Sequence, residues 1–157
     1  MKRIICLITL TFFIASCGPS KTVLESRKVI KGYWNLDNIT YDTPGKFNVT
    51  LFNDVSASCM EGSTWRFIPN NNTGTYTIEK EDCNSGERYF IFNIQEIDAA
   101  SGLYDFMLKP TNQKKKSESG AGFRIRLAHL DDSVMRWEQT VTLDGEPFKI
   151  NMNFSKE

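Results

Sequence analysis

The stretch that decides the fold is residues 122–154, GFRIRLAHLDDSVMRWEQTVTLDGEPFKINMNF. Apolar and polar side chains alternate through the runs 122–130, 134–143 and 147–154, and turn residues such as Asp144-Gly145-Glu146 separate the runs. Such alternation is typical of a strand that buries one face and leaves the other in water. The stretch therefore predicts consecutive antiparallel strands that cover a core.

The same pattern continues upstream. Further short alternating runs, separated by turn residues and without a ten-residue helical period, predict strands at 30–41, 46–52, 64–69, 73–80, 88–97 and 103–109. A meander of eight to nine strands hides its edges completely when it closes into a barrel. The predicted fold class is therefore all-β, an antiparallel up-and-down barrel, with a two-sheet β-sandwich as the alternative. Residues 54–62 are less strand-like, and we expect a short helix or loop there, over one barrel end.

One face of these strands is rich in aromatic side chains. The predicted inward-facing residues are Phe90, Phe92, Ile94, Tyr104, Phe106, Leu108, Phe123, Ile125, Leu127, Met135, Trp137, Val141, Phe148, Ile150, Met152 and Phe154. A barrel of this size either fills with side chains or holds one small ligand. If it holds a ligand, the predicted lining residues are Phe90, Phe92, Tyr104, Phe106, Phe123, Ile125 and Trp137.

The chain begins with a basic head, Met1-Lys2-Arg3, and an apolar run over 4–14 that ends in Ile14-Ala15-Ser16-Cys17. This order predicts a secretory signal peptide. A permanent transmembrane helix is disfavoured, because the run is shorter than the roughly 20 residues that span a bilayer. Ile-Ala-Ser-Cys resembles the bacterial lipobox, which implies cleavage after residue 16 and acylation of Cys17. An ordinary signal peptide that contains a cysteine is the alternative.

The residues after Cys17 suggest a location. Gly18 follows the cysteine, where lipoproteins retained in the inner membrane of enteric bacteria carry aspartate, and no acidic pair lies nearby. The resemblance to bacterial lipoproteins therefore implies the cell envelope, at the outer membrane and facing the periplasm. We expect a signal peptide at 1–16, a lipidated N-terminus and tether at 17–29 with a helical tendency over 22–28, and one domain at 30–157.

Two cysteines remain once Cys6 leaves with the signal peptide and Cys17 carries lipid. In an oxidising compartment Cys59 and Cys83 are expected to form a disulfide, and the hairpin predicted between them brings its outer ends together. A metal or redox pair is the alternative. It is disfavoured because Cys-x-x-Cys spacing is missing and the single histidine, His129, is far away in the sequence.

Gly32-Tyr33-Trp34, near the start of the first predicted strand, resembles the Gly-x-Trp signature of lipocalins. The stretch from Cys59 through Gly74-Thr75-Tyr76 to Cys83 resembles the lipocalin-like lipoprotein domains of Bacteroidetes. The resemblance covers about residues 30–155 and implies a lipocalin-like barrel that Gly32 and Trp34 help to close. In lipocalins this tryptophan stacks against a basic side chain of the last strands, which implies Arg136 or Lys149. The second lipocalin motif has only a loose match, at Asp131-Asp132.

The composition narrows the possible functions. Lys and Arg balance Asp and Glu at 19 each, and loss of Lys2 and Arg3 leaves a slight acidic excess. The chain is therefore expected to have no strong positive electrostatic field that would attract nucleic acid. Catalytic motifs and metal-ligand spacings are missing, and His129 on an alternating strand is interpreted as a barrel-wall residue. We expect no enzyme, metal or cofactor.

The expected function is that of a membrane-anchored, monomeric lipocalin-like lipoprotein, which binds or carries a small hydrophobic ligand. The alternative is a solidly packed barrel that acts as a structural module and contacts another envelope protein through loops 54–62 and 110–121.

Overall fold

The computed structural model describes residues 20–98 and 103–157. The elements are α1 (Lys21–Ile30), β1 (Gly32–Tyr41), β2 (Thr50–Leu51), β3 (Val55–Ser56), α2 (Ala57–Met60), β4 (Thr64–Ile68), β5 (Thr73–Ile78), β6 (Gly86–Asp98), β7 (Leu103–Thr111), β8 (Phe123–Leu130), β9 (Val134–Leu143) and β10 (Glu146–Lys156). Neither helix of this described part is long and apolar enough to cross a membrane.

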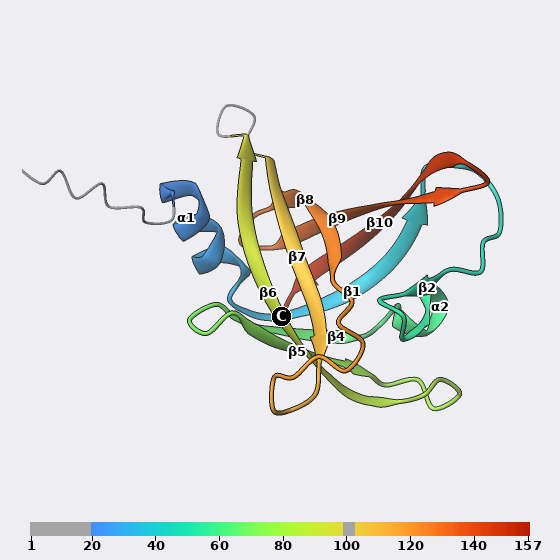
Figure 1. Ribbon diagram of the computed structural model, residues 1–157, viewed down its shortest axis with the longest axis horizontal. Helices are drawn as coiled ribbons and strands as arrows, with labels where there is room; N and C mark the ends of the chain where they lie inside the picture. The colour runs from blue at the N-terminus through green and yellow to red at the C-terminus, as the bar shows by residue number, and fades with distance from the viewer. Residues whose placement is uncertain (1–19, 99–102) are drawn as a thin grey trace, which may run out of the picture.

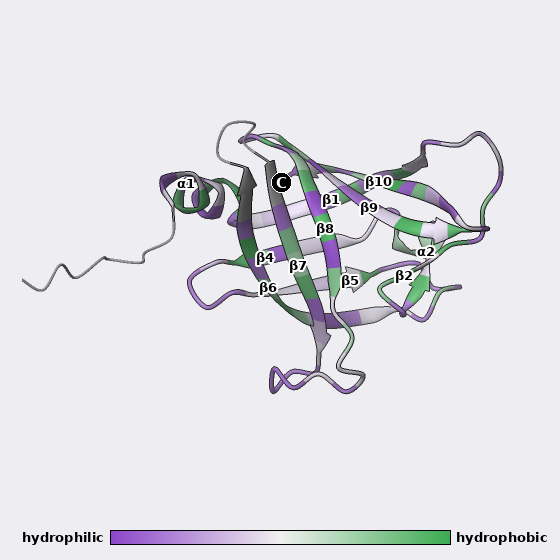
Figure 2. Ribbon diagram, turned by 45° about the horizontal axis from the view of Figure 1, so that its top comes forward, coloured by the Kyte–Doolittle hydropathy of each residue, from purple (hydrophilic) through white to green (hydrophobic). Residues whose placement is uncertain are grey.

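The larger strands close into a barrel, which confirms the predicted architecture over the β-sandwich (Figure 1). Around the barrel the order is β1-β10-β9-β8-β7-β6-β5-β4, and every neighbouring pair is antiparallel. Hydrophobic and hydrophilic residues alternate along these strands, as Figure 2 shows for β7 and β8. The alternation read from the sequence is therefore the inside-outside pattern of the barrel wall.

The strand predicted at 46–52 is wrong as part of the barrel. Only Thr50–Leu51 of this stretch forms a strand, and it pairs with Val55–Ser56 in a separate ladder. The place beside β1 is taken by β4, because Gly32 to Asn35 pair directly with Phe67 to Thr64. The segment between β1 and β4, residues 42–63, instead lies over one end of the barrel, and we call it the lid.

The helix α1 covers the opposite end, which we call the closed end. The Ser20 hydroxyl caps it by accepting a hydrogen bond from the Val23 amide at 3.3 Å. Val23, Ser26 and Ile30 are buried, and α1 contacts β6 and β8. The helical tendency expected at 22–28 is thus part of a packed helix.

Trp34 fills the closed end, but neither predicted basic partner stacks on it. Its indole N–H donates to the Ile30 carbonyl at 2.8 Å, and the Lys156 ammonium lies 5.1 Å from its ring centroid. Arg136 and Lys149 instead approach Glu138 on the wall, at 3.7 and 3.5 Å. The prediction missed Lys156 because it ended the last strand at residue 154, and β10 continues to Lys156.

The predicted inward position of the Val141 side chain is wrong. The alternation predicts an inward side chain, but Val141 is 37% exposed. Beyond Glu138, β9 has no pairing with β8, so this part of the strand runs past the wall of the barrel. The face of β9 that carries Val141 therefore has fewer side chains to pack against.

The Gly74 position offers a test of the packing. Gly74 lies opposite Phe90 in the β5–β6 ladder, and a Cβ atom there would stand 2.2 Å from the Phe90 ring and 2.5 Å from the Arg66 carbonyl oxygen. We expect Gly74→Ala to lower the free energy of unfolding by about 1–3 kcal/mol, because the ring and backbone must move apart.

Gly122→Ala is the matched control, since its added Cβ would approach nothing closer than the Leu108 carbonyl oxygen at 3.9 Å. Urea unfolding of both variants measures the difference. Equal stability of the two would contradict the tight approach of Phe90 to β5.

Candidate functional site

Five of the seven residues predicted to line a ligand cup fill the barrel interior instead of surrounding a space. Phe90, Phe92, Phe106, Ile125 and Trp137 are between 0% and 3% exposed. The Phe106 ring centroid is 5.0 Å from that of Phe92 and 4.9 Å from that of Trp137. A void large enough for a water molecule would leave accessible surface on the side chains around it. The structure therefore brings these residues together as a packed core, and their contact with a ligand stays a prediction.

The other two predicted lining residues are Phe123 and Tyr104. Phe123 begins β8 and is half-buried at the lid end, with its ring centroid 5.4 Å from that of Phe52. Tyr104 pairs with Leu127 in the β7–β8 ladder, but its side chain lies outside the described residues. Sequence alternation thus identified the inward face without separating core from site.

The lid inserts its own apolar side chains into the mouth of the barrel. Leu51, Phe52 and Met60 are 1%, 3% and 0% exposed. Phe52 reaches this place from a tight turn in which it and Asn53 have φ of 52° and 57°, and the Asp54 amide donates to the Leu51 carbonyl at 2.9 Å. A left-handed conformation costs a residue like phenylalanine about 1–2 kcal/mol. The buried ring contacts of Phe52 offset that cost, with Trp65 at 5.9 Å as the second partner.

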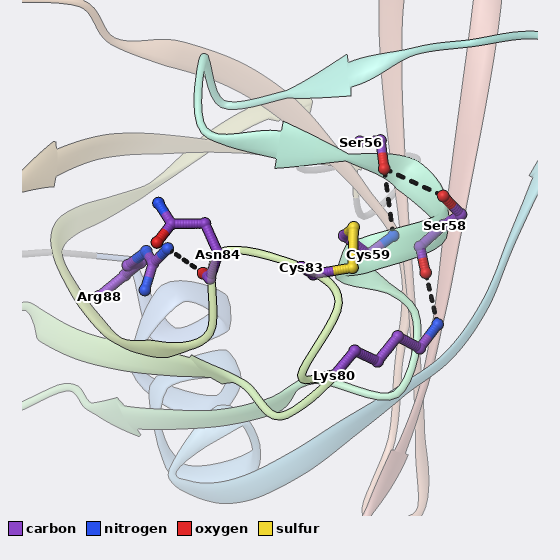
Figure 3. Close-up of a disulfide and its surroundings, with 7 residues drawn as sticks. All are labelled: Ser56, Ser58, Cys59, Lys80, Cys83, Asn84 and Arg88. Atoms are coloured by element: carbon purple, nitrogen blue, oxygen red, sulfur yellow. Dashed lines mark hydrogen bonds between the residues drawn. A yellow bond between two sulfur atoms is a disulfide. The ribbon is translucent and has the colours of Figure 1, made fainter.

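A covalent bond attaches the lid to the barrel, as Figure 3 shows. The predicted disulfide is confirmed: Cys59 in α2 joins Cys83, which follows β5, with 5.7 Å between the Cα atoms. Beside it the Lys80 ammonium donates to the Ser58 carbonyl, so the lid and the β5–β6 connector are joined twice. Residues 54–62 lie over one barrel end, as predicted.

A polar network that the sequence analysis missed centres on Asp54. The carboxylate accepts a hydrogen bond from the Tyr76 hydroxyl at 2.8 Å and pairs with Arg88 Nε at 3.2 Å. Arg88 also donates to the Asn84 carbonyl (Figure 3). Burial, and then the neighbouring Asp54 charge, raise the pKa of Tyr76 well above its ordinary value of 10.0, so the hydroxyl stays protonated. The available signal was Asn53-Asp54, a pair of turn-forming residues directly after the strand predicted at 46–52.

A hollow of about 470 Å³ opens above this network. Its wall is formed by the turn at 52–54, by β5 and β6, by the end of β7 and by the connector from β7 to β8, and we call it the mouth hollow. Apolar and aromatic surface comes from Phe52, Tyr76, Tyr89 and Pro110, and polar surface from Asn53, Asp54, Glu87, Arg88, Thr111, Asn112, Gln113, Glu118 and Ser119. Loops 54–62 and 110–121, which the sequence analysis named as possible contact loops, therefore both border it.

A second hollow, of about 380 Å³, lies between α1 and β8. His129 borders it, is exposed on the barrel wall and lies 2.9 Å from the Asp131 carboxylate. In the described part of the chain, no three His, Cys, Asp or Glu side chains are placed together to hold a metal ion. This hollow lacks the aromatic lining of the mouth hollow, so the mouth is the stronger candidate site.

Comparisons with known proteins bear on the fold. No family model matches the chain, and no curated protein matches its sequence. The structure is similar to that of a lipocalin-like protein from Bacteroides uniformis ATCC 8492, with 10% identity and a TM-score of 0.50, over 82% of this chain and 98% of that chain. A similarity at this identity shows the fold alone, and the fold is a lipocalin-like barrel.

The Asp54–Tyr76 hydrogen bond predicts a pH dependence. Below pH 10 both the folded and unfolded chains keep the Tyr76 proton, and the bond stabilises the fold fully. Above pH 10 the unfolded chain loses this proton while the folded chain keeps it, so stability falls by about 1.4 kcal/mol per pH unit through this group. Tyr76→Phe has no such proton, and we expect its stability to fall less steeply.

Urea unfolding at a series of pH values from about 8 to 11 measures this. The difference in stability between wild type and Tyr76→Phe should shrink as pH rises above 10. Parallel curves for the two proteins would show that the environment of Tyr76 is not the one described.

Proposed function

Because the chain folds as a lipocalin-like barrel, a fold that suggests small-molecule binding, we propose that it is a non-enzymatic binding protein of the cell envelope. It holds a small hydrophobic molecule at the mouth of the barrel and is anchored to the membrane by lipid on Cys17. The single observation that carries the ligand proposal is the mouth hollow, an aromatic-lined recess above a packed interior.

The size and lining of the mouth hollow support this proposal. About 470 Å³ falls within the range of about 300–1,000 Å³ that is usual for small-molecule sites. Tyr89 and Pro110 offer apolar surface to the ligand body, while Asn53 and Gln113 can orient a polar group. Such a mixture of apolar area and a few polar groups is typical of ligand sites.

The charged groups of the hollow suit binding better than catalysis. Asp54 already accepts from Tyr76 and pairs with Arg88, so it is not free to take a proton from a substrate. Tyr76, with its raised pKa, holds its own proton. These contacts also hold the floor of the hollow rigid.

Tyr89→Ser tests the ligand site, with Tyr33→Ser as its control, since Tyr33 is 45% exposed near the closed end. The probe is a fluorescent fatty acid titrated into each protein. We expect Tyr89→Ser to weaken binding about tenfold, because lost apolar contact is worth about 1.4 kcal/mol, and Tyr33→Ser to bind as the wild type does. Equal weakening in both variants, or no binding by the wild type, would overturn the proposal.

The packed interior favours a second candidate function. With no space among the inward side chains that the structure describes, the barrel would serve as a rigid support for loops 54–62 and 110–121, which would contact another envelope protein. The mouth hollow would then receive a side chain of that protein. Failure of the wild type to bind the probe, or any lipid during purification, would favour this alternative.

The anchor is proposed from the sequence, because residues 1–19 lie outside the described residues. The basic head, the apolar run and Ile14-Ala15-Ser16-Cys17 support it. Two or more acyl chains anchor a protein stably, whereas one chain binds only marginally. Since α1 begins at Lys21, only a few residues would separate the lipid from the closed end, and the mouth would face away from the membrane.

Metabolic labelling with a radioactive fatty acid tests the anchor in bacteria that make the full chain. We expect label in the wild type and in Cys6→Ser, because Cys6 lies in the signal peptide, and none in Cys17→Ser. Label that survives in Cys17→Ser would refute acylation at this residue.

A further inference from the structure

The barrel is not closed along its whole length, and one strand edge is left open. Pairing between β8 and β9 ends at Arg126 and Glu138, while β9 continues to Leu143 as one arm of the β9–β10 hairpin. In Figure 1 this hairpin extends beyond the body of the barrel. Residues 140–147 are all exposed, so nothing in the described chain covers the β9 side of the hairpin.

The hairpin geometry identifies the backbone groups on this edge. Asp144 and Gly145 form a two-residue loop with φ of 51° and 86°. The backbones of Leu143 and Glu146 are therefore hydrogen-bonded to each other, and non-hydrogen-bonded and hydrogen-bonded pairs alternate along the β9–β10 ladder from there. Thr142 and Thr140 consequently direct their N–H and C=O groups away from β10. Lys149, opposite Thr140, confirms this parity, because its amide and carbonyl both bond to Asp42 on the far side.

The residues along the edge lack the usual protection against strand pairing. Residues 139–143, Gln-Thr-Val-Thr-Leu, carry no charge and no proline and are rich in β-branched side chains. Val141 and Leu143 are 37% and 42% exposed. Natural edge strands usually carry a lysine, a proline or a bulge at such a place, so an unprotected edge points to a strand that pairs here.

The centre of the edge, Thr140-Val141-Thr142, is symmetric about Val141, which selects a second copy of the chain as its partner. We propose that two copies pair antiparallel through residues 139–143, with Val141 opposite Val141 and each Thr140 opposite Thr142 of the other copy. In this register the free N–H and C=O groups of Thr140 and Thr142 all find partners. Threonine pairs across strands are favourable, and no other register matches both threonines.

The pairing ends at Gln139 of one copy and Leu143 of the other, because Arg126 of β8 already lies opposite Glu138. Residues 139–143 carry no charge, so no like charges face each other within the paired stretch. The interface is short and falls below the roughly 1,000 Å² of stable complexes, so the dimer is weak and forms at high local density. Its detection therefore requires trapping.

Val141→Cys traps the dimer in membranes of cells that make the full chain. Residues opposite each other in a non-hydrogen-bonded pair have Cα atoms about 4.5 Å apart, within disulfide range, whereas Thr140→Cys residues would lie about 8 Å apart. After mild oxidation we expect Val141→Cys to give a product of twice the chain mass. Thr140→Cys should give at least fivefold less, and Val134→Cys, exposed elsewhere on β9, and the wild type should give none.

A proline variant separates strand pairing from chance collision. Thr140→Pro removes an N–H that bonds only across the proposed interface, so Thr140→Pro/Val141→Cys should keep its fold, checked by circular dichroism, and lose the crosslink. A monomeric Val141→Cys protein, an equal yield from Val134→Cys, a crosslink that survives the proline, or a product that contains a different protein would each overturn the proposal.

Discussion

An eight-stranded barrel encloses a volume that must be filled either by its own side chains or by a ligand, and here the rings around Trp65 fill it. The Trp65 ring centroid lies 4.5 Å from that of Tyr76, 5.3 Å from Trp137 and 5.8 Å from Phe154. Other features depend on this packing. Gly74 leaves the place that the Phe90 ring needs, and the lid adopts a left-handed turn to add a further ring at the mouth.

Because side chains fill the interior, a bound molecule would have to lie at the mouth of the barrel. With the inward residues in contact with one another, the space for a small molecule lies above the Asp54 network, between the lid and the connector from β7 to β8. The disulfide between Cys59 and Cys83 fixes one side of that space to the barrel. A ligand held there needs no rearrangement of the core, but its affinity depends on loops whose residues the strand pattern does not reveal.

The sequence predicts those features that a local pattern determines. Alternation locates the barrel strands because each has one wet and one buried face, and the flanking hairpin predicts the Cys59–Cys83 bond. Alternation fails where pairing between strands decides whether a side chain is buried. Val141 fits the alternating pattern, but the pairing of β8 with β9 stops before it. Lys156 was missed because the last strand was predicted to end at residue 154, whereas β10 continues to Lys156. The Asp54 network joins residues far apart in the chain, and no local signal connects them. Alternation also cannot separate a core aromatic from one that lines a site.

Xenon provides the most direct test that the barrel interior is full, because it enters dry apolar cavities without any polar contact. The indole N–H signals of Trp65 and Trp137 report on the interior in an NMR titration under xenon pressure. If the interior is packed as described, neither signal shifts beyond the small change that pressure alone produces. A saturable shift of either indole would reveal an empty cavity, and would return the ligand site to the inside of the barrel.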